Sequence, residues 1–228
     1  MFFDPMYLIF MAPAILLALW AQVRVKSAFH HGNQYQPRSG LSGAETAQRI
    51  LDTYQLHDVT IEPVNSFLGD HYDPRNKVLR LSPDVYNGRT LSALGIAAHE
   101  VGHAIQHAHS YGPLAVRNSL VPVAAVGTNL AWIFIIAGLA LAPFRALAIV
   151  GLALFAAGVL FSIITLPVEY DASKRARAIL LNNGMVTTDE DRVVGKVLNA
   201  AALTYVAAAI GALLQLAYWA LIVFGRRN

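Results

Sequence analysis

The sequence predicts a mainly α-helical membrane protein, in which four apolar helices span the bilayer and a small α+β element lies between the first two spans. Composition is the first reason: the 228 residues are 56% hydrophobic and 14% charged, with a mean hydropathy of +0.47. Ordinary soluble domains are less apolar and more charged. The second reason is that four apolar runs are long enough to cross a bilayer. Most polar residues fall in two segments between these runs, 25–118 and 167–199.

The first apolar run is Met6–Val23, which we interpret as the first span. Asp4 precedes this run, whereas Arg24 and Lys26 follow it. A cleaved signal peptide has the opposite order of charges. We therefore expect a retained transmembrane helix whose N-terminus lies outside the cell.

The composition then turns polar over 26–36, and we interpret 30–33 as a linker in which His30 and His31 are solvated loop residues rather than ligands. Beyond it, the segment Ser42–Glu45 matches a capping box, in which a serine and a glutamate three positions later satisfy the free N–H groups of a helix start. Apolar residues recur at helical spacing after it. The pattern predicts an amphipathic helix that ends near Gln55.

Two short segments, 59–64 and 77–82, alternate between apolar and polar residues, as half-buried strands do. Between them, 73–76 has the composition of a turn. We expect a small β-element here. A short helix should follow from Ser82, because Pro83 is well tolerated at a first helical position.

One H-E-x-x-H motif lies in the predicted helix Leu91–His109, which Thr90 can cap. His99 and His103 are four residues apart, so they lie about 40° apart around the helix axis and about 6 Å along it. Both imidazoles can reach one zinc ion. Glu100 lies beside the ion rather than on it, where a carboxylate can take a proton from water.

Three further apolar runs, 120–142, 146–166 and 200–224, are predicted as spans two, three and four. Only the short segment Pro143–Arg145 joins the second span to the third, so the two form a hairpin. A hairpin returns the chain to the side that it left. The motif helix and the segment 167–199 should therefore face the same compartment.

Charge indicates which compartment that is. Nine Lys and Arg lie between Arg24 and Arg117, five lie between Glu169 and Asn199, and the hairpin turn has one. By the positive-inside rule the polar segments are cytoplasmic. The C-terminal pair Arg226-Arg227, which would then lie outside, does not follow this rule.

A catalytic zinc ion usually has three protein ligands, so a third ligand must be found. His109 has the spacing of the metzincin motif, but Gln106 stands where that motif needs glycine. The helix should therefore continue and turn His109 away from the ion. His107 lies on the correct face, about 12 Å along the axis from His99, which is too far for a bond of about 2 Å. His107 is better placed as a partner around the site.

Glu169 is the stronger candidate, because it follows the third span directly and faces the same side as the motif helix. A carboxylate at the membrane boundary needs a partner, and a metal ion is one. The alternative is an interfacial glutamate paired with Lys174 or Arg175. Asp171 and Asn118 are candidates to orient the ligand histidines.

Three segments together resemble the YugP-type neutral zinc metallopeptidases of prokaryotic membranes. These are Gly69–Pro74, the motif segment Ala97–His107 and Pro167–Ser173. The similarity covers nearly the whole chain, including the four apolar runs. It is far more specific than the H-E-x-x-H motif alone.

The resemblance implies a gluzincin-like peptidase with a zincin-like element, in which His99, His103 and Glu169 bind zinc and Glu100 is the base. The chain departs from the wider gluzincin pattern at one position. An aspartate often follows the ligand glutamate by four residues, whereas Ser173 stands there in this chain.

The sequence thus predicts a membrane-embedded zinc endopeptidase with one zinc ion per chain and its active site on the cytoplasmic side of the cell membrane. His71, Tyr72 and Tyr86 are candidates to stabilise the oxyanion that forms during hydrolysis. The β-element could hold a substrate by strand addition, or it could only cover the helix. Substrates should be membrane-associated proteins or peptides.

Two alternatives from other classes are a non-catalytic zinc-binding scaffold or chaperone, and a small metal transporter. The spans contain almost no charged residues that could line a path for an ion, which argues against transport. There is no cysteine, so thiolate ligands are excluded. Basic residues form no stripe with aromatic residues, so we expect no nucleic-acid partner. The oligomeric state stays open.

Overall fold

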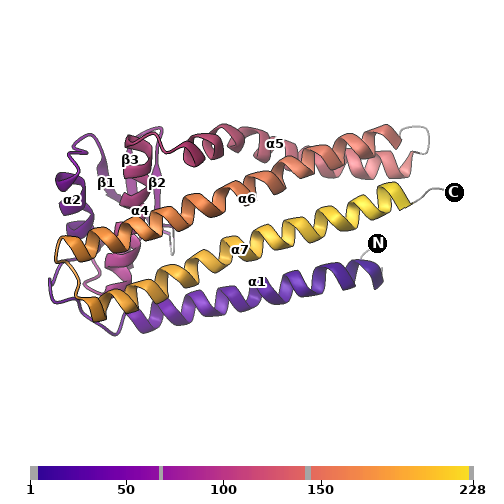
Figure 1. The fold of residues 1–228 in the computed structure, drawn as a ribbon. Coiled ribbons are helices and arrows are strands. Elements are labelled where there is room, and N and C mark those ends of the chain that lie inside the picture. Colours follow the sequence, from indigo (N-terminus) through magenta and orange to yellow (C-terminus); the bar gives the residue numbers. More distant parts are fainter. Residues whose placement is uncertain (1–4, 67–68, 142–144, 226–228) are drawn as a thin grey trace. The chain divides into compact units, whose positions relative to one another are not determined.

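The computed structural model describes residues 5–66, 69–141 and 145–225 (Figure 1). Most of this part is helical, with one small sheet. Two predictions concern Pro143-Phe144 and Arg226-Arg227, which lie outside the described residues. The elements, in chain order, are α1 (Pro5–Gly32), α2 (Gly43–Thr53), β1 (Thr60–Pro63), β2 (His71–Asp73), β3 (Val78–Leu81), α3 (Pro83–Tyr86), α4 (Leu91–Ala108), α5 (Gly112–Ala140), α6 (Arg145–Asn182) and α7 (Thr188–Gly225).

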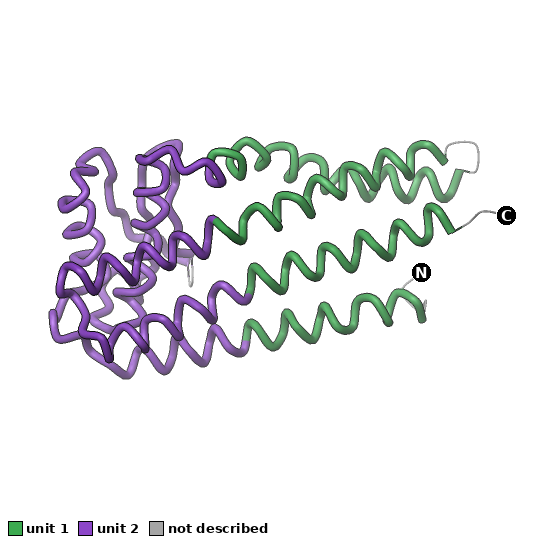
Figure 2. Tube along the Cα trace, viewed as in Figure 1, with its two compact units in different colours: residues 1–22, 115–167, 204–228 green, residues 23–114, 168–203 purple. Residues whose placement is uncertain are grey.

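The chain forms two compact units (Figure 2). Unit 1 consists of residues 1–22, 115–167 and 204–228, and unit 2 of residues 23–114 and 168–203. Helices α1, α6 and α7 contribute residues to both units.

Unit 1 contains the apolar parts of four helices, α1, α5, α6 and α7, each long and apolar enough to cross a membrane. This confirms the four predicted spans as helices. Large apolar side chains point outward from them; for example, Val126, Ile133 and Leu160 are 60%, 63% and 56% exposed. Side chains of this kind are stable on an outer surface when lipid replaces water around them. The chain is therefore a helical membrane protein.

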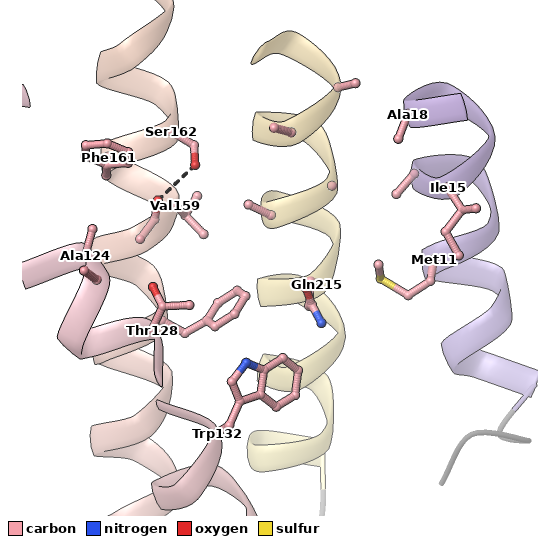
Figure 3. A pocket seen from close by; sticks show the side chains of 18 of the residues that line it. Met11, Ile15, Ala18, Ala124, Thr128, Trp132, Val159, Phe161, Ser162 and Gln215 are labelled. Atoms are coloured by element: carbon pink, nitrogen blue, oxygen red, sulfur yellow. Dashed lines mark hydrogen bonds between the residues drawn. The ribbon is translucent and has the colours of Figure 1, made fainter. Parts of the chain in front are cut away.

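Inside unit 1, aromatic rings pack edge to face. Trp132 contacts Phe155 at 5.9 Å and Trp219 at 5.4 Å between ring centroids. Beside this cluster lies an apolar cavity of about 730 Å³, to which all four helices contribute (Figure 3). Thr128 and Gln215 are among its few polar lining residues.

Unit 2 is built around α4, which contacts α2, α3, β2 and β3. Most residues of α4 are buried, so the apolar flanks of the motif form a core rather than a solvated surface. The predicted capping box begins α2: Glu45 N–H donates to Ser42 Oγ, and Ser42 N–H donates to Glu45 Oε2. The helix ends at Thr53, close to the predicted end.

The sheet has the strand order β1-β3-β2, with β3 in the centre. β1 runs parallel to β3, and β2 runs antiparallel to it, with Tyr72 opposite Leu79. Both predicted strands are confirmed. The third strand, β2, was not predicted, because Asp73 was assigned to the turn and the two residues before it are too few to show alternation.

The predicted linker over 30–33 is wrong for its first three residues, because α1 continues to Gly32. His30 and His31 lie on the exposed side of this helix rather than in a loop. The helix is held at its end by Ser92, whose Oγ donates to the buried carbonyl oxygen of Phe29 at 2.8 Å.

Helices α6 and α7 also continue past their apolar runs into unit 2. Between them, Gly184 adopts a positive φ of 63°, which a glycine tolerates at a helix end. The guanidinium of Arg177 donates two hydrogen bonds to the carboxylate of Asp191, at 2.9 and 2.6 Å. This paired contact joins α6 to the start of α7.

Candidate metal centre

The candidate centre begins on α4, whose start is fixed by Thr90. The Thr90 Oγ1 atom accepts from Ala93 N–H, as an N-cap residue does. One turn separates His99 from His103, and their rings lie at 4.8 Å between centroids and nearly perpendicular. The two imidazoles therefore face one point, as the spacing predicts.

Glu169 reaches the same point from α6. Its Oε2 atom lies 3.2 Å from His99 Nε2 and 3.5 Å from His103 Nε2. The two helices approach closely at Gly102, where an added β-carbon would stand 2.8 Å from the carbonyl oxygen of Ala172. This position inside the motif has no room for a side chain, so glycine allows α6 to bring Glu169 to the histidines.

The three side chains form a compact donor set, with ligand atoms within 4.8 Å of one another. Donors about 2 Å from a tetrahedral zinc ion are separated by about 3.3 Å. The two distances to Glu169 Oε2, 3.2 and 3.5 Å, match this value. Two nitrogen atoms and one carboxylate oxygen are also a usual ligand set for catalytic zinc. The residues therefore fit a zinc ion in size and chemistry.

Partners on the far side of each imidazole orient the two histidines. His99 Nδ1 is hydrogen-bonded to Ser173 Oγ at 3.1 Å, and His103 Nδ1 donates to Gln106 Oε1 at 3.0 Å. With Nδ1 held in this way, Nε2 of each ring is directed to the centre. Ser173, four residues after Glu169 in the chain, thus contacts a ligand histidine directly.

Gln106 is itself fixed. Its Nε2 group donates to the carbonyl oxygen of Val168 and to Asp171 Oδ2, both at 2.8 Å. Because both acceptors are oxygen atoms, the amide can point only one way, with Oε1 toward His103. Asp171, predicted to orient a ligand histidine directly, therefore contacts His103 through Gln106. Arg175 donates to the same Asp171 oxygen at 2.5 Å.

Electrostatics at the centre favour a cation. Burial by itself would lower the pKa of His103, but the hydrogen bond with Glu169 and the nearby carboxylate of Glu100 raise it above its ordinary value overall. Glu100 is buried, with 8% of its surface exposed. Two carboxylates beside two imidazoles supply negative charge that a divalent ion can balance.

The other predicted site residues are placed as follows. Tyr72, on β2, hydrogen-bonds through its hydroxyl to His107 Nδ1 at 3.0 Å, which ties the edge strand to α4. Burial raises the pKa of Tyr72 to about 12, so its hydroxyl stays a proton donor at neutral pH. His71 is exposed, and its Nδ1 donates to the Gly69 carbonyl oxygen at 2.7 Å.

Three further candidates are not part of the cluster of His99, His103 and Glu169. His109 is the C-cap residue of α4 and is exposed. Tyr86 packs against the core of unit 2 from α3. Asn118 belongs to unit 1. Sequence reasoning missed Gln106 and Ser173 as contacts of the histidines; the signal for Ser173 was its spacing of four residues from Glu169.

Comparisons with known proteins agree with the chemistry of this centre. Residues 7–224 match a protein family described as "Putative neutral zinc metallopeptidase". The chain is also 46% identical over 224 residues to a Bacillus subtilis (strain 168) protein named "Putative membrane protease YugP", and the match covers 98% of this chain and 99% of that protein. No solved structure matches the chain.

Proposed function

The chain belongs to this family of zinc metallopeptidases, and on that premise we propose that it is a membrane-embedded zinc endopeptidase. His99, His103 and Glu169 would bind one zinc ion per chain. One observation carries the proposal: three donor atoms from α4 and α6 lie within 4.8 Å of one another, and both histidines lie at the distance from Glu169 Oε2 that a tetrahedral zinc site requires. Each histidine is also hydrogen-bonded through the nitrogen on the far side of its ring. Such a site is gluzincin-like in its ligand set.

Zinc bound here would supply a Lewis acid that polarises a peptide carbonyl group and lowers the pKa of a neighbouring water molecule. Glu100 is one residue from His99 on the same helix and is buried. Its carboxylate would accept a proton from the attacking water and then protonate the leaving amine. Tyr72 and His71, from the strand beside α4, are the candidates to donate a hydrogen bond to the oxyanion.

The substrate would lie along the sheet. β2 is an edge strand that contacts α4, so its free side could pair with an extended peptide. Glu169 follows the third apolar run within three residues, so the centre should lie near the membrane surface, in the cytoplasm by the positive-inside rule. We therefore expect membrane-associated proteins or peptides as substrates, at the cell membrane, with no nucleic-acid partner.

The test is hydrolysis by the purified full chain in detergent, with zinc measured in the same samples. Casein, unfolded by reduction and heating, would serve as the probe. Glu100→Gln should retain one zinc per chain and lose activity at least a hundredfold, the usual contribution of a general base. Glu62→Gln, on the exposed face of β1, is the matched control and should remain active. Full activity of Glu100→Gln would refute the assigned base.

The alternative function is a zinc-binding scaffold or chaperone without hydrolysis. The Glu100→Gln variant distinguishes the scaffold from the peptidase when it is expressed in a cell that lacks the chromosomal gene. If Glu100→Gln restores the wild-type phenotype as well as the wild-type gene does, the scaffold is favoured. If Glu100→Gln does not restore the phenotype, although the variant binds zinc and is present in the membrane at normal abundance, the peptidase is favoured.

A further inference from the structure

Unit 2 has a cavity of about 520 Å³ that is lined by basic residues and by no acidic ones. It is formed by α1, α6 and α7. Arg24 and His31 line it from α1, and Lys196 lines it from α7. The other polar lining residues, Ser27, Asn199 and Tyr170, carry neutral hydrogen-bond donors. No carboxylate is among the lining residues.

Buried packing fixes the walls of this cavity. A β-carbon on Gly32 would stand 3.0 Å from Val197 Cγ2, so the end of α1 lies directly against α7. Gly32 and Val197 directly follow His31 and Lys196 in the chain, so this contact holds the two basic residues near each other. The third wall, α6, is joined to α7 by the paired hydrogen bonds of Arg177 and Asp191. The basic residues therefore line one cavity because three helices pack around it.

Each of the three helices lines the cavity with residues that lie next to the end of an apolar run. Arg24 directly follows the run Met6–Val23, Tyr170 lies shortly after the run 146–166, and Asn199 directly precedes the run 200–224. Residues that flank spans lie at the level of the lipid headgroups. Basic pockets between helices on the cytoplasmic side are suited to acidic headgroups.

We propose that this cavity binds the phosphate group of an anionic ligand. The guanidinium of Arg24 can hold two phosphate oxygens at once, Lys196 adds a point charge, and the neutral donors complete the contacts. Two sources supply such a group: the headgroup of an acidic phospholipid and a soluble phosphate ester. Neither the zinc ligands nor Glu100 line the cavity, so this proposal stands apart from the peptidase.

The test compares two double variants of the full chain in detergent. Arg24→Gln/Lys196→Gln removes two charges from the cavity. Lys26→Gln/Lys174→Gln removes two charges from exposed positions on α1 and α6 that do not line it. Each double variant removes two positive charges, so non-specific electrostatic attraction of the protein to an anionic lipid should weaken equally in both. The probes are short-chain phosphatidylglycerol, short-chain phosphatidylcholine, inorganic phosphate and glycerol phosphate, titrated by native mass spectrometry.

The wild type should bind phosphatidylglycerol in preference to phosphatidylcholine. The cavity variant should bind it about thirtyfold more weakly, since each basic residue near a membrane surface contributes about fivefold. The control variant should stay within about twofold of the wild type. If inorganic phosphate and glycerol phosphate bind as tightly as phosphatidylglycerol, with the same loss in the cavity variant, the source is a soluble ester.

Equal losses in the two double variants, or a wild type that binds none of the anionic probes, would overturn the proposal. Unchanged zinc content and an unchanged melting temperature show that the cavity variant is folded. If it is not, Lys196→Gln and His31→Gln are measured singly. Lys196→Gln alone should then weaken binding of the anionic probe about fivefold. If Lys196→Gln binds the probe as tightly as the wild type does, the proposed site is wrong.

Discussion

Gly102 lies against the backbone of Ala172: a β-carbon at Gly102 would stand 2.8 Å from the Ala172 carbonyl oxygen. The glycine is the fourth residue of the His99–His103 motif, and Ala172 lies three residues beyond Glu169 on α6. A contact between two backbones therefore sets the distance between the histidines and the carboxylate. The proposed zinc site depends on this close approach as much as on its ligands.

Gly102→Ala should weaken both folding and zinc binding. The added methyl group overlaps a backbone atom, which costs about 1–3 kcal/mol, whereas the gain in helix propensity is about 1 kcal/mol. We expect a net loss of up to about 2 kcal/mol in the free energy of unfolding, together with weaker zinc binding in competition with a chelator. Gly112→Ala is the control, because a β-carbon there meets nothing within 4 Å. If the two variants have the same free energy of unfolding and the same zinc affinity, the backbone at Gly102 can move to accept a methyl group.

Glu169→Gln should lose zinc, whereas His109→Ala should keep it. A neutral amide is a weaker zinc ligand than a carboxylate. His109 is exposed at the end of α4 and is separate from the donor set. The metal content of the purified variants, measured by mass spectrometry, shows which of the two residues is the third zinc ligand. Zinc retained by Glu169→Gln and lost by His109→Ala would reverse the assignment of the third ligand.

Ser173→Ala should lower zinc affinity about 10–100-fold without abolishing it, since partners that orient a ligand have effects of this size. The substitution removes the hydroxyl group that is hydrogen-bonded to His99 Nδ1. Ser162→Ala on the same helix is the control, because its hydroxyl donates only to the Gly158 carbonyl oxygen. The affinities would come from zinc competition with a fluorescent chelator. An unchanged affinity for Ser173→Ala contradicts an orienting role.

Asp191→Asn should reduce stability more than Asp189→Asn. Asp191 is 8% exposed and accepts two hydrogen bonds from Arg177, whereas Asp189 and Arg192 form an exposed pair. Arg177 is 39% exposed, so solvent screens part of the interaction. We expect a loss of about 1–2 kcal/mol for Asp191→Asn and less than about 0.5 kcal/mol for Asp189→Asn. Thermal unfolding in detergent measures both.

Elements with local signals were predicted well. Thr90 caps α4, and the predicted helix Leu91–His109 differs from the observed one by a single residue at its end. Ser42 and Glu45 likewise fixed the start of α2. Such signals are read from a few neighbouring residues, because a helix start needs acceptors for its first N–H groups.

Features that depend on tertiary packing were not predictable. The apolar runs of α1, α6 and α7 end where charged residues appear, but the helices themselves continue beyond these points. In the continued segments the polar side chains face solvent, and only one side of each helix is buried. β2 exists because β3 pairs with it. Gln106 served only as evidence against His109, whereas its contact with Asp171 joins α4 to a residue 65 positions away. No local pattern marks such a contact.

The centre also imposes an order on biosynthesis. His99 and Glu169 are separated by 70 residues, and the second and third apolar runs, 120–142 and 146–166, lie between them in the chain. A growing chain on the ribosome contains both histidines before either of these apolar runs has been made. The third donor emerges only after both have been made. A chain whose translation stops in the hairpin lacks the carboxylate, so the proposed hydrolysis should need a chain made beyond both of these apolar runs.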